Sequence, residues 1–169
     1  DDADAMKFLT SIVLLGTRID MGTIKSLGYE NLDDLIEKLS NMGFIYQYNN
    51  CIYFPNYNLL RDNLLETISK IYLEEVAKEL FAKVFNDDMP SPVKAYLYGL
   101  LQEIDNERKQ WEELAEIDLS LGDFNAYLNC ENKIIELLNK NEDPEKEEEI
   151  EAYKNELYEN ISNNLYDYI

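Results

Sequence analysis

Acidic side chains are the residues of this chain best suited to chemistry. Paired carboxylates can act as general acid and base, or as ligands for a hard cation. A dense group of them follows the sole tryptophan, Trp111: Glu112, Glu113, Glu116 and Asp118. The sequence has no histidine, which excludes a His-dependent catalytic triad and the usual Cys/His zinc sites. We therefore interpret the group as a solvated helix face, and we expect no catalytic residue, no metal ligand and no cofactor in this chain.

A second acidic group is the run EKEEE at residues 145–149. Such a run could bind calcium or a basic partner. It lacks the alternating spacing and the glycine of a calcium-binding loop. Acidic residues are also favoured in the first turn of a helix, where they face the positive end of the helix dipole. The favoured interpretation is the solvated first turn of a helix.

The charge balance restricts the class of partner. The chain of 169 residues has 35 acidic residues against 15 basic ones, for a net charge of -20. Nucleic-acid binding depends mainly on Lys and Arg neutralising phosphates, and the densest basic stretch, Arg108-Lys109, is surrounded by glutamates. A surface this acidic repels nucleic acid and anionic lipid, so we expect neither as a partner.

The compartment can be judged from cysteine usage and apolar runs. Cys51 and Cys130 are far apart in the sequence and indicate buried thiols in a reducing compartment. No apolar run approaches the ~20 residues of a membrane span. We expect a cytoplasmic protein. The chain begins Asp-Asp-Ala-Asp-Ala without an initiator methionine, which favours a fragment of a larger protein.

The first third of the chain predicts three helices and a hairpin. Apolar residues recur at helical spacing over 5–15, 21–27 and 32–42, with Gly16, Gly28 and Gly43 as terminators and Asp20 and Asn31 as caps. Aromatic and β-branched runs at 44–48 and 51–54 flank Asn49-Asn50, a two-residue hairpin signal. Three helices followed by a hairpin is the order of a winged helix, here residues 1–56.

The remaining chain predicts helices alone. We place them near 57–69, 71–86, 92–104, 107–121, 124–140 and 144–167. The last opens with Asp143 as cap and Pro144 at its first position, which suits a helix start. Its apolar stripe is Ile150, Tyr153, Leu157, Ile161 and Leu165. The predicted fold class is therefore mainly α, with a helical connector at 57–105 and a region of antiparallel helical pairs at 106–169.

The predicted winged helix is poorly suited to DNA. The third helix of a DNA-binding winged helix lies in the major groove and needs basic and amide side chains. Here it reads LDDLIEKLSNM, with Lys38 as its one cation, and the hairpin YQYNNCIY has no Arg or Lys. DNA binding by a winged-helix regulator stays an alternative that would require a basic face. A structural spacer is the favoured interpretation.

Residues 2–85 resemble a segment of STAND-class signalling ATPases. LLGTRID at 14–20 is similar to the "LLG-x-x-F-D" opening of their winged helix, and LIEKLSNMGF at 35–44 is similar to the "L-x-x-L-x-x-x-G-[LF]" that follows. LLRDNLL at 59–65 resembles their "LLREALY" helix. In that family the segment joins a nucleotide-binding domain to tetratricopeptide repeats, and a histidine that can contact nucleotide often precedes this helix. Asn56 or Tyr57 stands near that place here, and the chain has no phosphate-binding loop.

Residues 108–140 resemble one tetratricopeptide repeat. Trp111, Leu114 and Ala115 fit the start of its first helix, and Gly122-Asp123-Phe124 fits the turn and the opening of the second. Tyr127 and Ile134 stand where small residues are usual and are expected to push the helices apart, so the repeat is degenerate. If the last helix lacks its partner, its apolar stripe favours a homodimer.

Tyrosine is unusually frequent, with 13 residues. Tyrosine is enriched in recognition surfaces because it offers contact area with little entropy to lose. Coding bias is the simpler explanation, since Asn, Ile and Lys are frequent too. The candidate interaction surface is the tyrosine group of the last helix, namely Tyr153, Tyr158, Tyr166 and Tyr168.

These expectations combine into one functional hypothesis. The resemblance implies a non-catalytic regulatory connector in a signalling ATPase or transcription regulator, which contacts protein partners or neighbouring domains of its own chain. A free-standing acidic protein that mimics nucleic acid is a further alternative, and an enzyme of unknown type would need a perturbed carboxylate pair in a deep pocket.

Overall fold

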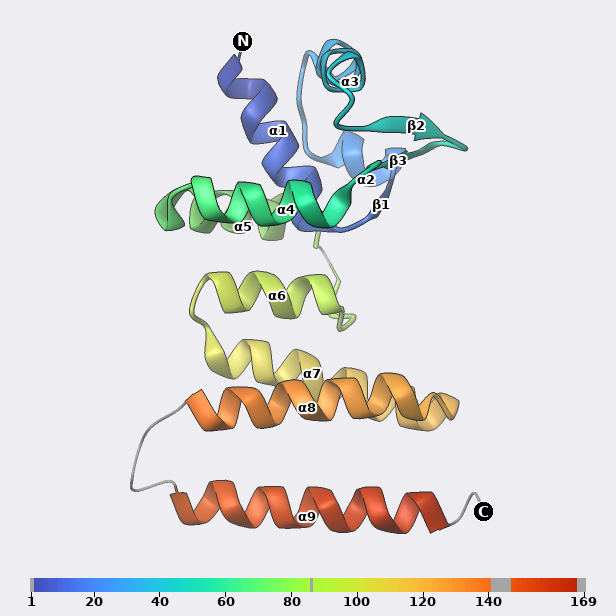
Figure 1. Cartoon of the computed structure of the whole chain (residues 1–169), viewed down its shortest axis with the longest axis vertical. Helices are drawn as coiled ribbons and strands as arrows, with labels where there is room; N and C mark the ends of the chain where they lie inside the picture. The colour runs from blue at the N-terminus through green and yellow to red at the C-terminus, as the bar shows by residue number, and fades with distance from the viewer. Residues whose placement is uncertain (1, 86, 141–146, 167–169) are drawn as a thin grey trace. The chain divides into compact units, whose positions relative to one another are not determined.

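The computed structural model describes residues 2–85, 87–140 and 147–166, which are mainly α-helical with one small sheet (Figure 1). The chain divides into two compact units. One comprises the residues up to Met89 together with Tyr96–Glu103, and the other comprises Pro90–Ala95 together with the residues from Ile104 onward. The predicted mainly helical class is confirmed.

The first unit contains a small sheet among its helices. In chain order its elements are α1 (Asp2–Leu15), β1 (Arg18–Asp20), α2 (Met21–Ser26), α3 (Leu32–Asn41), β2 (Tyr46–Tyr48), β3 (Cys51–Tyr53), α4 (Tyr57–Thr67) and α5 (Lys70–Lys83). The strands are antiparallel in the order β1-β3-β2. The second half of α6 (Pro92–Leu100) also belongs to this unit.

The predicted hairpin is confirmed, and its turn explains why. Asn49 and Asn50 have φ values of 46° and 60°, in the left-handed region that asparagine tolerates. The two central residues of such a turn match the right-handed twist of the strands they join. Gly43, with φ 77°, ends α3 as expected.

The sheet has a third strand that the sequence did not predict. β1 pairs with β3, so that Arg18 lies opposite Tyr53, and Ile19 lies opposite Ile52. Three residues between a helix terminator and a helix cap are too few to show a period of two. The expectation of a bare hairpin was therefore wrong by one strand.

The core of the first unit is built around α1. Phe8 and Ile12 on this helix are fully buried, together with Ile24 of α2 and Ile52 of β3. Burial of side chains of this size stabilises a fold by about 1.5–3 kcal/mol each. Helices α3, α4 and α5 all pack against α1. Part of the segment predicted as a separate connector thus shares a core with the predicted winged helix, while the three-domain division stays a prediction.

The second unit is a helical hairpin with a further helix packed on it. Its main elements are α7 (Ile104–Leu121), α8 (Phe124–Lys140) and α9 (Glu147–Tyr166), and α7 and α8 form the most extensive helix contact (Figure 1). The Asp123 carboxylate accepts a hydrogen bond from the Ala126 backbone N–H at 3.0 Å and so caps α8. The turn that precedes α8 requires a positive φ, and Gly122 supplies it with φ 74°.

Several predicted helix ends differ from the structure. The helix expected over 71–86 ends at Lys83, and the helix expected over 92–104 ends at Leu100. Gln102 follows α6 with φ 60°, and α7 starts three residues early, at Ile104. Asn31 precedes α3, but its side chain makes no capping hydrogen bond. The predicted cap Asp143 and Pro144 lie outside the described residues.

Candidate interaction surfaces

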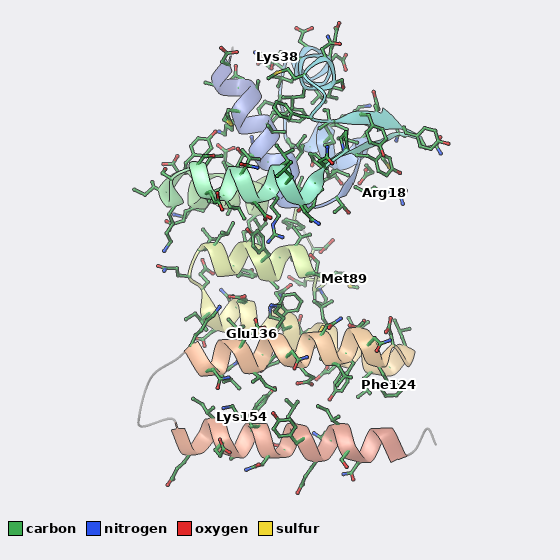
Figure 2. The ribbon with its side chains drawn as sticks, viewed as in Figure 1. Arg18, Lys38, Met89, Phe124, Glu136 and Lys154 are labelled. Carbon is green, nitrogen blue, oxygen red and sulfur yellow. The ribbon has the colours of Figure 1, made fainter. Side chains whose placement is uncertain are left out.

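Helix α3 presents an acidic face to solvent. Leu35, Ile36 and Leu39 point into the core of the first unit, which leaves Asp33, Asp34 and Glu37 exposed. The only cation of the helix is already engaged, because Lys38 Nζ lies 2.6 Å from Asp2 Oδ1. This hydrogen bond lowers the pKa of the Asp2 carboxyl. Figure 2 shows Lys38 on this helix.

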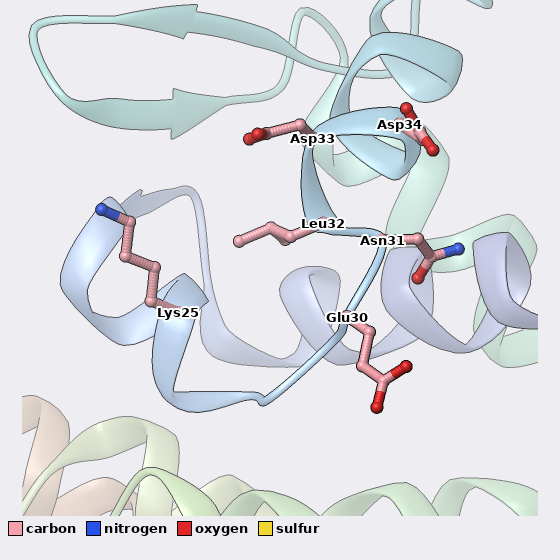
Figure 3. A pocket seen from close by; sticks show the side chains of 6 residues that line it. All are labelled: Lys25, Glu30, Asn31, Leu32, Asp33 and Asp34. Atoms are coloured by element: carbon pink, nitrogen blue, oxygen red, sulfur yellow. The ribbon is translucent and has the colours of Figure 1, made fainter.

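A shallow pocket of about 370 Å³ lies at the start of α3. The side chains of Leu32 and Asp33 point toward the side of the pocket on which Lys25 of α2 lies. Glu30 points away from that side (Figure 3). The complete lining is Lys25, Glu30, Asn31, Leu32, Asp33 and Asp34. Carboxylates in the first turn already face the positive end of the helix dipole. They would repel a phosphate, so the pocket is unsuited to a nucleic-acid backbone.

One face of the sheet carries an aromatic row. The strand register places Arg18, Tyr53 and Tyr46 side by side across the three strands. The rings of Tyr46 and Tyr53 stack with their centroids 5.4 Å apart. Arg18 Nε donates a hydrogen bond to Cys51 Sγ at 3.5 Å. The hairpin itself has no Lys or Arg, but β1 places Arg18 beside it. The sequence did not predict this cation at the sheet, because it did not predict β1.

Three of the residues predicted for repeat packing, Trp111, Leu114 and Ala115, belong to one cluster in the second unit. Ala115, Tyr127 and Cys130 are buried together, and Trp111 and Leu114 pack against them, half-buried. Phe124 is also half-buried, at the start of α8, and Gly122 stands in the turn before it. Tyr127 and Ile134 are buried, with 5% and 1% of their surfaces exposed. These large side chains are thus accommodated in the interior, and Tyr127 shares its cluster with the small side chain of Ala115.

The acidic group around Trp111 is dispersed over separate contacts. Arg108 Nε lies 3.2 Å from Glu112 Oε1, and Lys109 Nζ lies 3.7 Å from Glu113 Oε1. Asp118 accepts a hydrogen bond from the Cys130 thiol at 3.6 Å, while Glu116 is exposed. Within the described residues, no group of three or more His, Cys, Asp or Glu side chains is placed to hold a metal ion.

A buried carboxylate that sequence reasoning did not single out lies on α8. Glu131 is only 7% exposed. Burial raises the pKa of its carboxyl, the hydrogen bond from Tyr127 acts against this rise, and the nearby charge of Glu112 adds to it. Burial and the Glu131 charge raise the pKa of Tyr127 to about 12. Glutamate in the middle of an amphipathic helix gives no sequence signal that it is buried.

The predicted tyrosine surface on the last helix does not form a single patch among the described side chains. Tyr153 is half-buried, and burial together with the charges of Glu131 and Glu112 raises its pKa to about 12. Tyr158 points outward and is 59% exposed. The Tyr166 side chain and all of Tyr168 lie outside the described residues.

The apolar stripe of the last helix packs within its own chain where it is described. Leu157 is 5% exposed, and Ile161 packs against the cluster of Ala115, Tyr127 and Cys130. Ile150 is half-buried, and the Leu165 side chain lies outside the described residues. The uncovered stripe that favoured a homodimer is therefore not found in this part of the helix, and self-association stays a prediction.

Two further observations bear on the setting of these surfaces. No helix within the described ranges has both the length and the apolar character of a membrane span. Cys51 and Cys130 are both buried as free thiols.

No protein-family model, curated protein or solved structure matches the chain.

Proposed function

We propose that this chain is a non-catalytic connector that binds a basic protein surface through α3. The observation that carries the proposal is the face of α3, where Asp33, Asp34 and Glu37 are exposed and the one cation, Lys38, is bound by Asp2. In a winged helix this is the helix that would enter a DNA groove. An acidic face there favours a protein partner rich in Lys and Arg over nucleic acid.

The second unit suits the same role. A long helical hairpin with a third helix on it is the building block of repeat proteins, which present extended surfaces to peptides or domains. The resemblance to STAND-class ATPases implies a connector between a nucleotide-binding domain and repeats. In that setting the chain relays a nucleotide-dependent state by rearranged packing, with no bond chemistry of its own. The cytoplasm is the compartment that this role and the free thiols favour.

The contact through α3 can be tested by photo-crosslinking. A photoreactive amino acid at position 37 is expected to crosslink to a Lys- or Arg-rich protein surface, identified by mass spectrometry of the crosslinked peptides. Changing Asp33 and Asp34 to Lys in the same chain should abolish these crosslinks. A photoreactive residue at exposed position 116 of α7 is the matched control and should keep its own crosslinks. Crosslinks from position 37 to nucleic acid, or crosslinks insensitive to charge reversal, would overturn the proposal.

The connector role is tested separately by the flanking coding sequence. About 300 codons on each side, roughly two domain lengths, should encode a phosphate-binding loop upstream and further helical repeats downstream. Flanks that encode neither would contradict the ATPase setting while leaving the contact through α3 to the crosslinking result.

A further inference from the structure

The carboxylate of Glu131 is buried without a full set of hydrogen bonds. One of its oxygens is paired with the Tyr127 hydroxyl one turn earlier on α8. The other, Oε2, is buried and has no hydrogen-bond partner in the described part of the chain. An ionised carboxylate accepts hydrogen bonds and cannot donate them, so an unpaired buried oxygen costs far more in the charged form than in the protonated form.

The groups around Glu131 do not neutralise it. Glu112 approaches from α7 and disfavours a second negative charge. Tyr153, from α9, stands close enough that the charge of Glu131 raises its pKa, and Glu112 and Glu156 act on it in the same direction. Arg108 of α7 is the nearby cation, but its guanidinium is the ion-pair partner of Glu112 at 3.2 Å. The carboxyl therefore has hydroxyl and carboxyl neighbours and, beside it on α8, the Cys130 thiol. Among the described residues it has no ion-pair partner of its own.

Helix α9 contributes to this burial. Leu157 is buried, and Ile161 packs on the cluster that contains Tyr127. If α9 moves away, water reaches the groups of α8 that Tyr153 and Ile161 approach. The docked arrangement thus favours protonated Glu131, and the undocked arrangement tolerates the ionised form.

We propose that the protonation state of Glu131 controls the docking of α9 on the α7–α8 hairpin. Proton binding to Glu131 holds α9 in place, and loss of the proton releases it. The sign follows from linkage. A carboxyl whose pKa is higher in the docked state binds more protons there, so docking is strongest below its ordinary pKa and weakens as pH rises through the raised value. Release of α9 uncovers the apolar cluster on which Trp111 packs, as a surface for a partner. This inference does not depend on the contact proposed for α3.

Two measurements can follow the docking of α9: the fluorescence of Trp111, and the hydrogen exchange of the backbone amides of α9. Trp111 packs against the cluster that Ile161 covers, so its fluorescence reports the docking of α9. Hydrogen exchange with mass spectrometry follows the amides of α9 directly, and the helices of the first unit serve as an internal reference. The titration of the purified chain should run from about pH 5.5 to 9, clear of the isoelectric point near 4.2.

In the wild-type chain we expect α9 to lose protection as pH rises, after correction for the intrinsic exchange rate, with a parallel change in Trp111 fluorescence. Glu131→Gln keeps the acceptor for Tyr127 and removes the charge, so α9 should stay protected across the range. Glu136→Gln is the matched control. Glu136 lies on the same helix (Figure 2). It is exposed and bound to Lys133 at 2.8 Å, and its variant should follow the wild type.

A second variant distinguishes the effect of charge from a local packing defect that Glu131→Gln could cause. Glu112→Gln removes the like charge and frees Arg108, and both changes favour ionised Glu131, so the α9 transition should move to lower pH. The proposal is overturned if Glu131→Gln keeps the wild-type pH profile. It is equally overturned if the first unit loosens in parallel with α9, since that result would indicate repulsion across the whole acidic chain.

Discussion

The carboxylate of Asp20 accepts two hydrogen bonds from Thr23, one from its backbone N–H at 3.0 Å and one from its hydroxyl at 2.6 Å. Asp20 is also the last residue of β1, where it lies opposite Cys51. One side chain thus fixes the point at which the strand stops and α2 starts. The same contact, first through the hydroxyl of Thr23 and then through its N–H, lowers the pKa of Asp20.

Replacing Asp20 by Ala should therefore destabilise the first unit by about 1 kcal/mol, the usual effect of losing a helix cap. The loss is measured as a lower midpoint of urea denaturation followed by circular dichroism. Because the pKa of Asp20 is lowered, its contribution is present above the ordinary carboxyl pKa and is lost as pH falls through the lowered value. Asp20→Asn should keep most of the cap.

Asn31→Ala is the matched comparison, because Asn31 also precedes a helix but makes no capping hydrogen bond. Its cost should be a few tenths of a kcal/mol at most. Equal losses for Asp20→Ala and Asn31→Ala would show that the observed capping geometry does not decide stability here.

Local signals made much of this fold predictable. Asn49-Asn50 marked the hairpin because few residues tolerate two successive left-handed conformations, and Gly43 marked the end of α3 for the same reason. Such features depend only on neighbours in the sequence. The helix expected over 124–140 was likewise correct, because the buried residues of α8 repeat at helical spacing over several turns.

Features that depend on distant residues were not predictable. β1 is a strand only because β3 lies beside it, and Lys38 is neutralised by Asp2, 36 residues earlier. Glu131 reads as one more charged residue on a helix, and its burial comes from packing against α7 and α9. Sequence patterns report which face of a helix is apolar, but they do not report what a neighbouring helix covers.

The charge of α3, more than its shape, should decide whether this chain binds DNA. The wild-type chain is expected to give no shift of a duplex at about 10 μM protein, within the usual range of non-specific affinities. Changing Asp33, Asp34 and Glu37 together to Lys should create a shift that disappears at higher salt. An electrophoretic mobility series at several salt concentrations measures both.

The control for this variant carries the same change in charge elsewhere, as Glu116, Glu151 and Glu159 all changed to Lys. These residues are exposed in the second unit. If both variants bind duplex DNA equally, overall charge explains the result, and the geometry of α3 has no special part in it.

Ala115 and Tyr127, which are buried in one cluster, should behave as a coupled pair. Ala115→Leu alone is expected to cost about 1–3 kcal/mol, because the core has no room for the larger side chain. Tyr127→Ala alone should cost about 3–5 kcal/mol, as for other buried aromatics. In the double variant the leucine fills the space that the tyrosine left, so the combined loss should be smaller than the sum by about 1 kcal/mol or more. Additive losses in urea denaturation would show that the two side chains do not share space.

Cys130 should be nearly inert to thiol reagents in the folded chain. Burial first, and then the hydrogen bond to Asp118, raise the pKa of its thiol to about 11. The thiolate is the reactive form, so labelling by an aromatic disulfide at pH 8 should be about 100-fold slower than in the urea-unfolded chain, resolved by peptide mass spectrometry. Asp118→Asn removes the negative charge and should recover only part of the rate, because burial remains. Full recovery in Asp118→Asn would make the carboxylate the main cause, and labelling of the folded wild type at the unfolded rate would contradict the burial of Cys130.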